Sequence, residues 1–288
     1  MEDIPRFAND YMAEDLELVK SGCIEVAARL NDLLDNILLV GGAVSALLID
    51  HHQKLDIATD RSDPLSAHVG TRDLDLGLAV GVLNKRRYSE ISTRLKESGF
   101  KPDENASGNQ TTHRWKHCDA EKLTIDFLIA PVEKEETGGN IRNLESDFSA
   151  IVVPGLDLAL EDPHPIQLSG TALDGSEMSI EIPVCGPGGF VLLKALACQK
   201  RGKDKDKYDL FYVLRNYEKG PERVAHSFRP FLERGAAEAE QAVDIMEEYF
   251  DDSNSRGPRA VSNFLYGHQD DTVEADAAAF VQAFLRAL

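Results

Sequence analysis

The chain has 288 residues, in which 31 lysines and arginines face 50 aspartates and glutamates, so the formal net charge is −19 at pH 7. Hydrophobic residues make up 42% and charged residues 28%, a balance typical of a globular protein with a buried core and not of a disordered chain. So negative a chain repels polyphosphate at long range. This argues against a broad nucleic-acid-binding surface but leaves room for a local basic pocket.

The sequence also bears on where the protein resides. No apolar run approaches the roughly 20 residues of a membrane-spanning helix. The N-terminal segment MEDIPRFANDYMAED is acidic and has no apolar signal-peptide core. The four cysteines, Cys23, Cys118, Cys185 and Cys198, form no C-x-x-C pair, a usage typical of reduced thiols. We therefore expect a cytoplasmic protein that does not bind membranes.

The first two thirds of the chain mix helical and strand-like patterns. In chain order, the predicted elements are a helix over 12–35, a buried strand over 37–40, a helix from 43 that ends near 51–52, a strand over 73–80, a basic amphipathic helix over 85–99, a hairpin of strands over 111–117 and 122–130, and short strands near 151–153 and 177–184. Residues 53–70 and 133–150 are polar or glycine-containing and are predicted to be loops.

From Phe190 onward the apolar pattern is helical. It predicts helices over 189–200, 205–217, 221–250 and 272–288, with a polar break over 251–258. The sequence therefore predicts an α+β protein, with a first domain over 1–185 and a mostly helical domain over 186–288.

Two aspartates alternate with leucines in the segment TRDLDL (71–76). On a strand, Asp73 and Asp75 point to one face with Cα atoms roughly 6–7 Å apart, and Leu74 and Leu76 point to the other. Two carboxylates this close repel each other unless a cation lies between them, and Mg²⁺ prefers such oxygen ligands. The pair indicates either a divalent-cation site or two solvated acids on an exposed strand face.

A third acid interrupts the apolar, β-prone segment LTIDFLIA (123–130). Asp126 lies at its centre, where an unpaired carboxylate would be costly to bury. If this strand pairs with the strand over 73–80, side chains facing each other lie roughly 5 Å apart. Three acids would then gather around one or two divalent cations. The alternative is that Asp126 marks the edge of a sheet.

Gly41 and Gly42 separate the predicted strand over 37–40 from the helix that follows. Glycines at such a turn let backbone N–H groups approach phosphate oxygens at the positive end of the helix. The spacing is not that of a dinucleotide fingerprint, and the chain contains no P-loop sequence. A glycine pair can also make a tight turn without any ligand.

Taken in order, LLVGGAVSALL (38–48), TRDLDLGL (71–78) and LTIDFLIA (123–130) resemble the polymerase-β-type nucleotidyltransferase fold, whose members share a glycine pair, a D-x-D motif and a third aspartate. Further along, FVLLKALA (190–197) and KDKYDL (205–210) resemble the later motifs of one branch. That branch is the AbiEii-type abortive-infection toxins, the nucleotidyltransferase half of type IV toxin–antitoxin pairs.

The resemblance assigns roles to particular residues. It implies nucleotide binding by Gly41, Gly42, Lys194 and Lys205, binding of Mg²⁺ or Mn²⁺ by Asp73, Asp75 and Asp126, and catalysis by the three aspartates with Lys194 and Asp206; Asp126 would complete the metal site or act as a general base. It also implies transfer of a nucleoside monophosphate from a nucleoside triphosphate to a hydroxyl of RNA, such as tRNA, or of protein, and an antitoxin as partner. Compared with the smaller members of the fold, segment 53–70 would be an inserted loop.

Positive charge is concentrated in two segments, 85–101 and 194–207, which each carry six basic residues against two acids. On so acidic a chain these segments could attract a nucleoside triphosphate or an RNA end, or they could be solvated helix faces. Lys194 lies in an otherwise apolar helix, where its ammonium must reach either solvent or an anion.

Two other functions fit parts of the pattern. Asp73 and Asp75 could hold a nucleotide-sugar in a glycosyltransferase, which would leave Asp126 and Lys194 unexplained. A protein of the same fold could also bind a nucleotide without catalysis. Hydrolysis of nucleotide-sugars would identify the first, and triphosphate binding without pyrophosphate release would identify the second.

Overall fold

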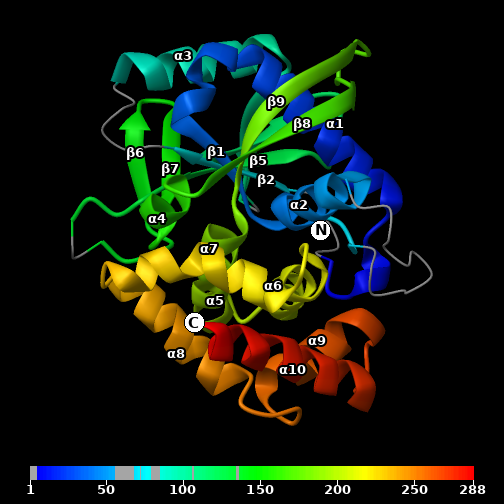
Figure 1. Ribbon diagram of the computed structural model, residues 1–288. Coiled ribbons are helices and arrows are strands. Elements are labelled where there is room, and N and C mark those ends of the chain that lie inside the picture. The colour runs from blue at the N-terminus through cyan, green and yellow to red at the C-terminus, as the bar shows by residue number, and fades with distance from the viewer. Residues whose placement is uncertain (1–4, 56–67, 72, 79–84, 106, 134–135) are drawn as a thin grey trace. The chain divides into compact units, whose positions relative to one another are not determined.

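The computed structural model describes residues 5–55, 68–71, 73–78, 85–105, 107–133 and 136–288 (Figure 1). The chain divides into a sheet unit, residues 13–44 and 71–185, and a helical unit, residues 1–12, 45–70 and 186–288. The sequence places a division at the same point, between 185 and 186, but assigns segments 1–12 and 45–70 to the first domain. The predicted loop over 53–70 lies largely outside the described residues.

The described part of the sheet unit contains a mixed sheet of nine strands. They are β1 (Ile37–Val40), β2 (Asp73–Leu78), β3 (Phe100–Glu104), β4 (Gln110–His117), β5 (Thr124–Ile129), β6 (Ile141–Glu145), β7 (Phe148–Val152), β8 (Pro163–Thr171) and β9 (Glu177–Cys185). Seven of them follow the spatial order β3-β4-β5-β2-β1-β9-β8, while β7 pairs with β5 and β6. The strand with Asp126, β5, is therefore an interior strand, which excludes the alternative that Asp126 marks a sheet edge.

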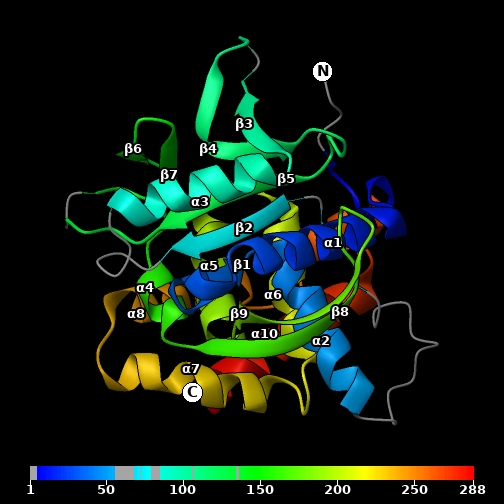
Figure 2. The ribbon, with the colours of Figure 1, turned by 90° about the horizontal axis from the view of Figure 1, so that it is seen from above.

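Two helices, α1 and α3, cover one face of this sheet. The sheet unit contains α1 (Ala13–Arg29), the 3-10 segment η2 (Asn31–Asn36), α3 (Lys85–Glu97) and α4 (Leu156–Leu160). In Figure 2, α1 and α3 lie across the strands, with α1 in contact with β2, β8 and β9 and α3 with β3, β6 and β7. Beneath α3, Trp115 packs edge-to-face against Phe127 and Phe148. These contacts form the aromatic part of the core.

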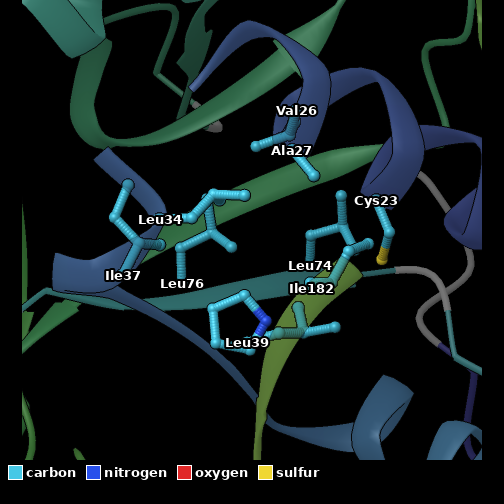
Figure 3. A pocket seen from close by; sticks show the side chains of 10 residues that line it. Cys23, Val26, Ala27, Leu34, Ile37, Leu39, Leu74, Leu76 and Ile182 are labelled. Carbon is cyan, nitrogen blue, oxygen red and sulfur yellow. The ribbon is translucent and has the colours of Figure 1, made fainter. Parts of the chain in front are cut away.

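The leucines of β2 fix which face of that strand is apolar. Leu74 and Leu76 are buried and lie beneath Val26 and Ala27 of α1, where they line an apolar cavity of about 20 Å³ (Figure 3). A cavity of this size and lining has no room for a ligand. Because side chains alternate along a strand, Asp73 and Asp75 project from the opposite face of the sheet.

The helical unit is built from long helices. It contains η1 (Ala8–Asp10), most of α2 (Gly42–Leu55), α5 (Pro187–Arg201), α6 (Asp204–Asn216), α7 (Pro221–Glu233), α8 (Ala237–Tyr249), α9 (Arg256–Tyr266) and α10 (Asp271–Ala287). α5 packs against α6, α7 and α8, and α6 packs against α9 and α10. In the described part of the chain, no helix is long and apolar enough to cross a membrane.

Most predicted elements are present, but three strands are not in the prediction. β8 begins with the sequence PHP, and a proline has no backbone N–H to donate to a neighbouring strand. The strand forms nevertheless because it lies at the edge of the sheet, where it pairs only with β9. β6 lies in the predicted loop over 133–150, and β3 follows directly on Gly99. Part of the predicted strand over 73–80, residues 79–80, lies outside the described residues.

The predicted helical pattern of the C-terminal part needs two corrections. The single helix predicted over 221–250 is two helices, because Gly235 adopts φ +68° after α7 and the chain turns before α8 begins. The predicted polar break over 251–258 contains the start of α9, with Pro258 in its first turn, where a missing N–H costs nothing.

Candidate functional site

The three candidate aspartates and an arginine meet on the face of the sheet opposite α1. In the register of neighbouring strands, Asp75 of β2 is opposite Val40 of β1 on one side and Asp126 of β5 on the other. Asp126 is in turn opposite Arg114 of β4. We call Asp73, Asp75, Asp126 and Arg114 the acid row. Directly opposite residues on adjacent strands have Cβ atoms about 5 Å apart, so these side chains form one contiguous surface.

The two acids of β2 differ in their surroundings from the acid of β5. Asp73 and Asp75 are half-buried, and Oδ1 of Asp73 accepts a hydrogen bond of 2.6 Å from the hydroxyl of Thr124. Asp126 is only 6% exposed, between the apolar residues of an interior strand. A buried carboxylate needs a partner of opposite charge or several hydrogen-bond donors.

Arg114 is that partner. Its Nε donates to Oδ1 of Asp126 at 2.6 Å, and its Nη2 donates to Oδ2 at 2.5 Å, a bidentate pair. These hydrogen bonds raise the pKa of Arg114 above its ordinary value, and the charges of Asp126, Asp73 and Asp75 add to the effect. The guanidinium is therefore a fixed positive charge beside three carboxylates.

Gly41 follows the last residue of β1 and lies against Asp75 of the acid row. It adopts φ +76°, in the left-handed region, and α2 begins at the next residue, Gly42. A Cβ built on Gly41 would lie 1.9 Å from Oδ2 of Asp75, which is far inside van der Waals contact. Two features therefore require glycine at position 41: the left-handed backbone conformation and the close approach of the Asp75 carboxylate.

We expect Gly41→Ala to disrupt the acid row. The new methyl group must displace the Asp75 carboxylate, so binding of divalent cations, measured with Mn²⁺ by electron paramagnetic resonance, should fall by at least about 10-fold. Gly108→Ala is the matched control, because Gly108 has the same φ of +76° but a Cβ added there would meet no atom within 4 Å. Equal cation binding by the two variants would show that the contact with Asp75 has no functional consequence.

The donors of the acid row fit a hard divalent cation. Mg²⁺ is usually held by one or two carboxylates together with substrate phosphates and water, and Asp73 with Asp75 supplies the two carboxylates. In the described residues, no group of three or more His, Cys, Asp or Glu side chains forms a ready metal cage. Both oxygens of the third carboxylate, Asp126, are engaged by Arg114. The role of Asp126 as a metal ligand stays a prediction.

Lys194, Lys205 and Asp206 lie in the helical unit, within a buried ionic network. The Lys194 ammonium donates to Oδ1 of Asp206 at 3.0 Å and to Oδ2 of Asp209 at 2.6 Å. Lys205 donates to both oxygens of Asp209, at 2.8 and 3.0 Å. Arg201 adds a bond of 3.1 Å to Oδ1 of Asp206. Lys194 therefore reaches anions and not solvent, which decides between the two alternatives for a lysine in an apolar helix.

Opposite charges within the network stabilise the charged forms of Lys194 and Asp209 against burial. Burial works to lower the pKa of Lys194, but the charges of Asp209 and Asp206 outweigh it and raise that pKa above its ordinary value. Burial works in the opposite direction on Asp209, yet Lys194 and Lys205 hold its pKa well below the ordinary value. Among the described residues, Oδ2 of Asp206 is buried without a hydrogen-bond partner. The roles that the resemblance gives to Lys194, Lys205 and Asp206 stay predictions.

His68 joins this network through a single ring nitrogen. The backbone N–H of Gly70 donates to Nδ1 of His68 at 2.9 Å, so the ring hydrogen is on Nε2. Nε2 lies 2.8 Å from Oγ of Ser45 and 3.1 Å from Oδ1 of Asp209. In a serine hydrolase the serine and the carboxylate bind opposite ring nitrogens. The arrangement of Ser45, His68 and Asp209 is therefore structural and not that of a catalytic triad.

Protonation of His68 should destabilise the fold. Burial lowers the pKa of His68 below 6.5, an effect that Lys205 and Lys194 reinforce and that Asp209 only partly offsets. Below pH 6.5 His68 gains a proton in the unfolded chain but not in the folded chain. The free energy of unfolding therefore decreases as the pH is lowered from 6.5 to the folded-state pKa of His68. His68→Gln should reduce this slope, measured by urea unfolding between pH 5 and pH 7.5, and His226→Gln, at an exposed position, should leave it unchanged. Equal slopes for wild type and His68→Gln would contradict this assignment.

Three basic residues of α3, Arg87, Arg94 and Lys96, are paired with neighbouring acids. Arg94 pairs with Asp32 and Glu90, and Arg87 donates to Glu90 at 3.0 Å. Lys96 pairs with Asp147. These pairs neutralise much of the positive charge that the sequence places over 85–101. They favour the interpretation of α3 as a solvated helix face over its interpretation as a binding site for an RNA end.

One hollow in the sheet unit lies apart from the acid row. It is a groove of about 480 Å³ between η2, the start of β1 and the β8–β9 hairpin, and its lining includes Asn31, Asp35, Pro165 and Glu181. None of the predicted site residues lines it. The assignment of the acid row therefore depends on its chemistry and not on this groove.

Sequence reasoning missed Arg114 in the acid row and Asp209, Arg201 and His68 in the ionic network. The predicted hairpin turns at 119–120, which by itself pairs position 114 with the neighbourhood of 126, so the antiparallel register was a usable signal. Asp209 follows Asp206 by three positions on a helix, a spacing that places both carboxylates on one face.

Comparisons with known proteins add no assignment, since no protein-family model matches the chain and no curated protein is significantly similar to it.

Proposed function

We propose that the protein is a metal-dependent nucleotidyltransferase with a polymerase-β-like fold, which transfers a nucleoside monophosphate from a nucleoside triphosphate to an acceptor hydroxyl. The observation that carries the proposal is the acid row, in which Asp75 and Asp126 are register partners beside the turn at Gly41. The resemblance assigns these same residues to one site, although they are far apart in the sequence.

Asp73 and Asp75 would hold Mg²⁺ or Mn²⁺, which when bound stabilises negative charge on the phosphates and on the leaving pyrophosphate. Asp126 holds Arg114 in place through the bidentate pair. The turn at Gly41 and Gly42 leads into the N-terminus of α2, where backbone N–H groups and the helix dipole favour a phosphate group. Together these groups orient a polyphosphate and offset its charge.

The acceptor and the partner are narrower proposals that rest on the resemblance. RNA or protein would supply the accepting hydroxyl, and a toxin role would require an antitoxin. The net charge of −19 and the ion-paired surface of α3 disfavour a broad RNA interface. An RNA acceptor would therefore be held near its reacting end.

One observation favours a second candidate, a module that binds a nucleoside triphosphate without transferring it. Both oxygens of Asp126 accept from Arg114, so this carboxylate is less available as a general base or metal ligand. In that case the acid row would bind triphosphate and divalent cation but no pyrophosphate would be released.

The test is incubation of the purified chain with each of the four α-³²P-labelled nucleoside triphosphates, Mg²⁺ and total cellular RNA or protein. We expect pyrophosphate release and labelling of one acceptor class, both abolished by chelation of the cation. Binding of triphosphate without pyrophosphate release would support the second candidate. Absence of both binding and release would refute the nucleotide assignment.

A further inference from the structure

Arg114 stands at the cationic end of the acid row, and neither the sequence motifs nor the resemblance gives it a role. We propose that Arg114 binds the phosphates of the nucleoside triphosphate and that Asp126 positions its guanidinium for this purpose. The inference rests on the proposed function, of which it uses only the binding of triphosphate and not its transfer.

The first argument is the geometry of the pair. A guanidinium has five N–H donors, and Asp126 receives one from Nε and one from Nη2. Asp126 is buried in an interior strand, so it anchors one edge of the guanidinium in a fixed orientation. The Arg114 side chain is nevertheless 39% exposed, so part of it reaches the surface. An anchored guanidinium of this kind suits the planar, directional recognition of phosphate oxygens.

The second argument is charge. Asp73, Asp75 and Asp126 carry three negative charges on one surface, which would repel a triphosphate strongly. A divalent cation offsets two of these charges, and Arg114 offsets the third. With Arg114 present, an acid row that holds one divalent cation is neutral, and the phosphates can approach it without net repulsion.

The third argument is that a contribution to stability does not by itself explain why the chain has the Arg114–Asp126 ion pair. A buried ion pair is often no more stabilising than well-packed apolar residues of similar volume. Leu128, two residues along β5 and therefore on the same face as Asp126, is a buried apolar residue, so an apolar side chain would suit the position. A function for the guanidinium accounts for both the charge and its partner.

Lys116 provides a matched control. It lies on β4 two residues from Arg114, so it projects from the same face of the sheet, and it also has a carboxylate partner, Asp103 at 3.0 Å. That partner is on β3, on the side of β4 away from the acid row. Loss of the Lys116 charge therefore tests the general effect of one fewer cation on this face.

The experiment measures two affinities in wild type, R114Q, R114K and K116Q. One is the affinity for an α,β-methylene nucleoside triphosphate with Mg²⁺, by isothermal titration calorimetry with each of the four bases. The other is the affinity for Mn²⁺ alone, by electron paramagnetic resonance. R114Q should lose at least about 10-fold in analogue affinity, with Mn²⁺ affinity unchanged or tighter, because a charge-assisted phosphate contact is lost and a nearby positive charge is removed. R114K should be intermediate, and K116Q should match wild type in both.

R114Q leaves Asp126 without its partner, so the double variant R114Q/D126N, which has no unpaired charge, is measured beside it with thermal unfolding of each protein. Analogue binding equal to wild type in a folded R114Q or R114Q/D126N would overturn the inference and leave the proposed function standing. Absence of analogue binding by wild type would overturn both.

Discussion

Nucleotide transfer should fall by at least about 100-fold when Asp75 is replaced by asparagine. Mutation of a residue that only hydrogen-bonds to a metal ligand already lowers activity by up to about 100-fold, and Asp75 is proposed as a ligand itself. Asp75 is the central member of the acid row, in register with Asp126 and in contact with the turn at Gly41. Asparagine keeps the shape of the side chain and removes its charge, so binding of divalent cations is lost while packing is preserved. Incorporation of ³²P from a labelled triphosphate measures the effect.

Asp75→Asn should not destabilise the folded protein. Removal of one of several neighbouring carboxylates relieves their repulsion, so the unfolding temperature of Asp75→Asn should equal or exceed that of wild type. Asp103→Asn, which removes the partner of Lys116 on β3, is the control and should transfer nucleotide at the wild-type rate. Retained transfer in Asp75→Asn would show that the acid row is not the reaction centre.

Lys194→Met should lower the free energy of unfolding of the helical unit by about 3–5 kcal/mol. Lys194 is 6% exposed and donates to two buried carboxylates, Asp206 and Asp209. Methionine fills much of the same volume, so the loss arises from the carboxylates that are left without this partner. Urea unfolding followed by far-ultraviolet circular dichroism measures the change.

The control for this prediction is Lys200→Met, on the same helix but exposed, which should alter stability by less than about 0.5 kcal/mol. If Lys194→Met were as stable as Lys200→Met, the ionic network would contribute nothing to folding.

The strands that carry the site were predictable because their patterns are strong. β1 is a short apolar run buried along its whole length, and β2 alternates acids with leucines. The hairpin of β4 and β5 followed from two β-prone runs around a short turn. β6 and β8 were not predictable from local sequence, since β6 is polar and β8 contains two prolines, and both form through pairing with a neighbouring strand.

The site itself was predictable only in part. The alternation in β2 places Asp73 and Asp75 on one face, but their proximity to Asp126 depends on a parallel pairing of strands that lie far apart in the sequence. No local pattern specifies that pairing. The same holds for Asp209 and His68, which come together through tertiary packing of the helical unit.

The most direct test of the acid row is a titration of the wild-type chain and of Asp75→Asn with Mn²⁺, followed by electron paramagnetic resonance with and without a non-hydrolysable triphosphate. We predict that wild type binds Mn²⁺, that the triphosphate tightens this binding, and that Asp75→Asn shows neither effect. Identical Mn²⁺ titrations for the two proteins would contradict the assignment of this surface as a metal and nucleotide site.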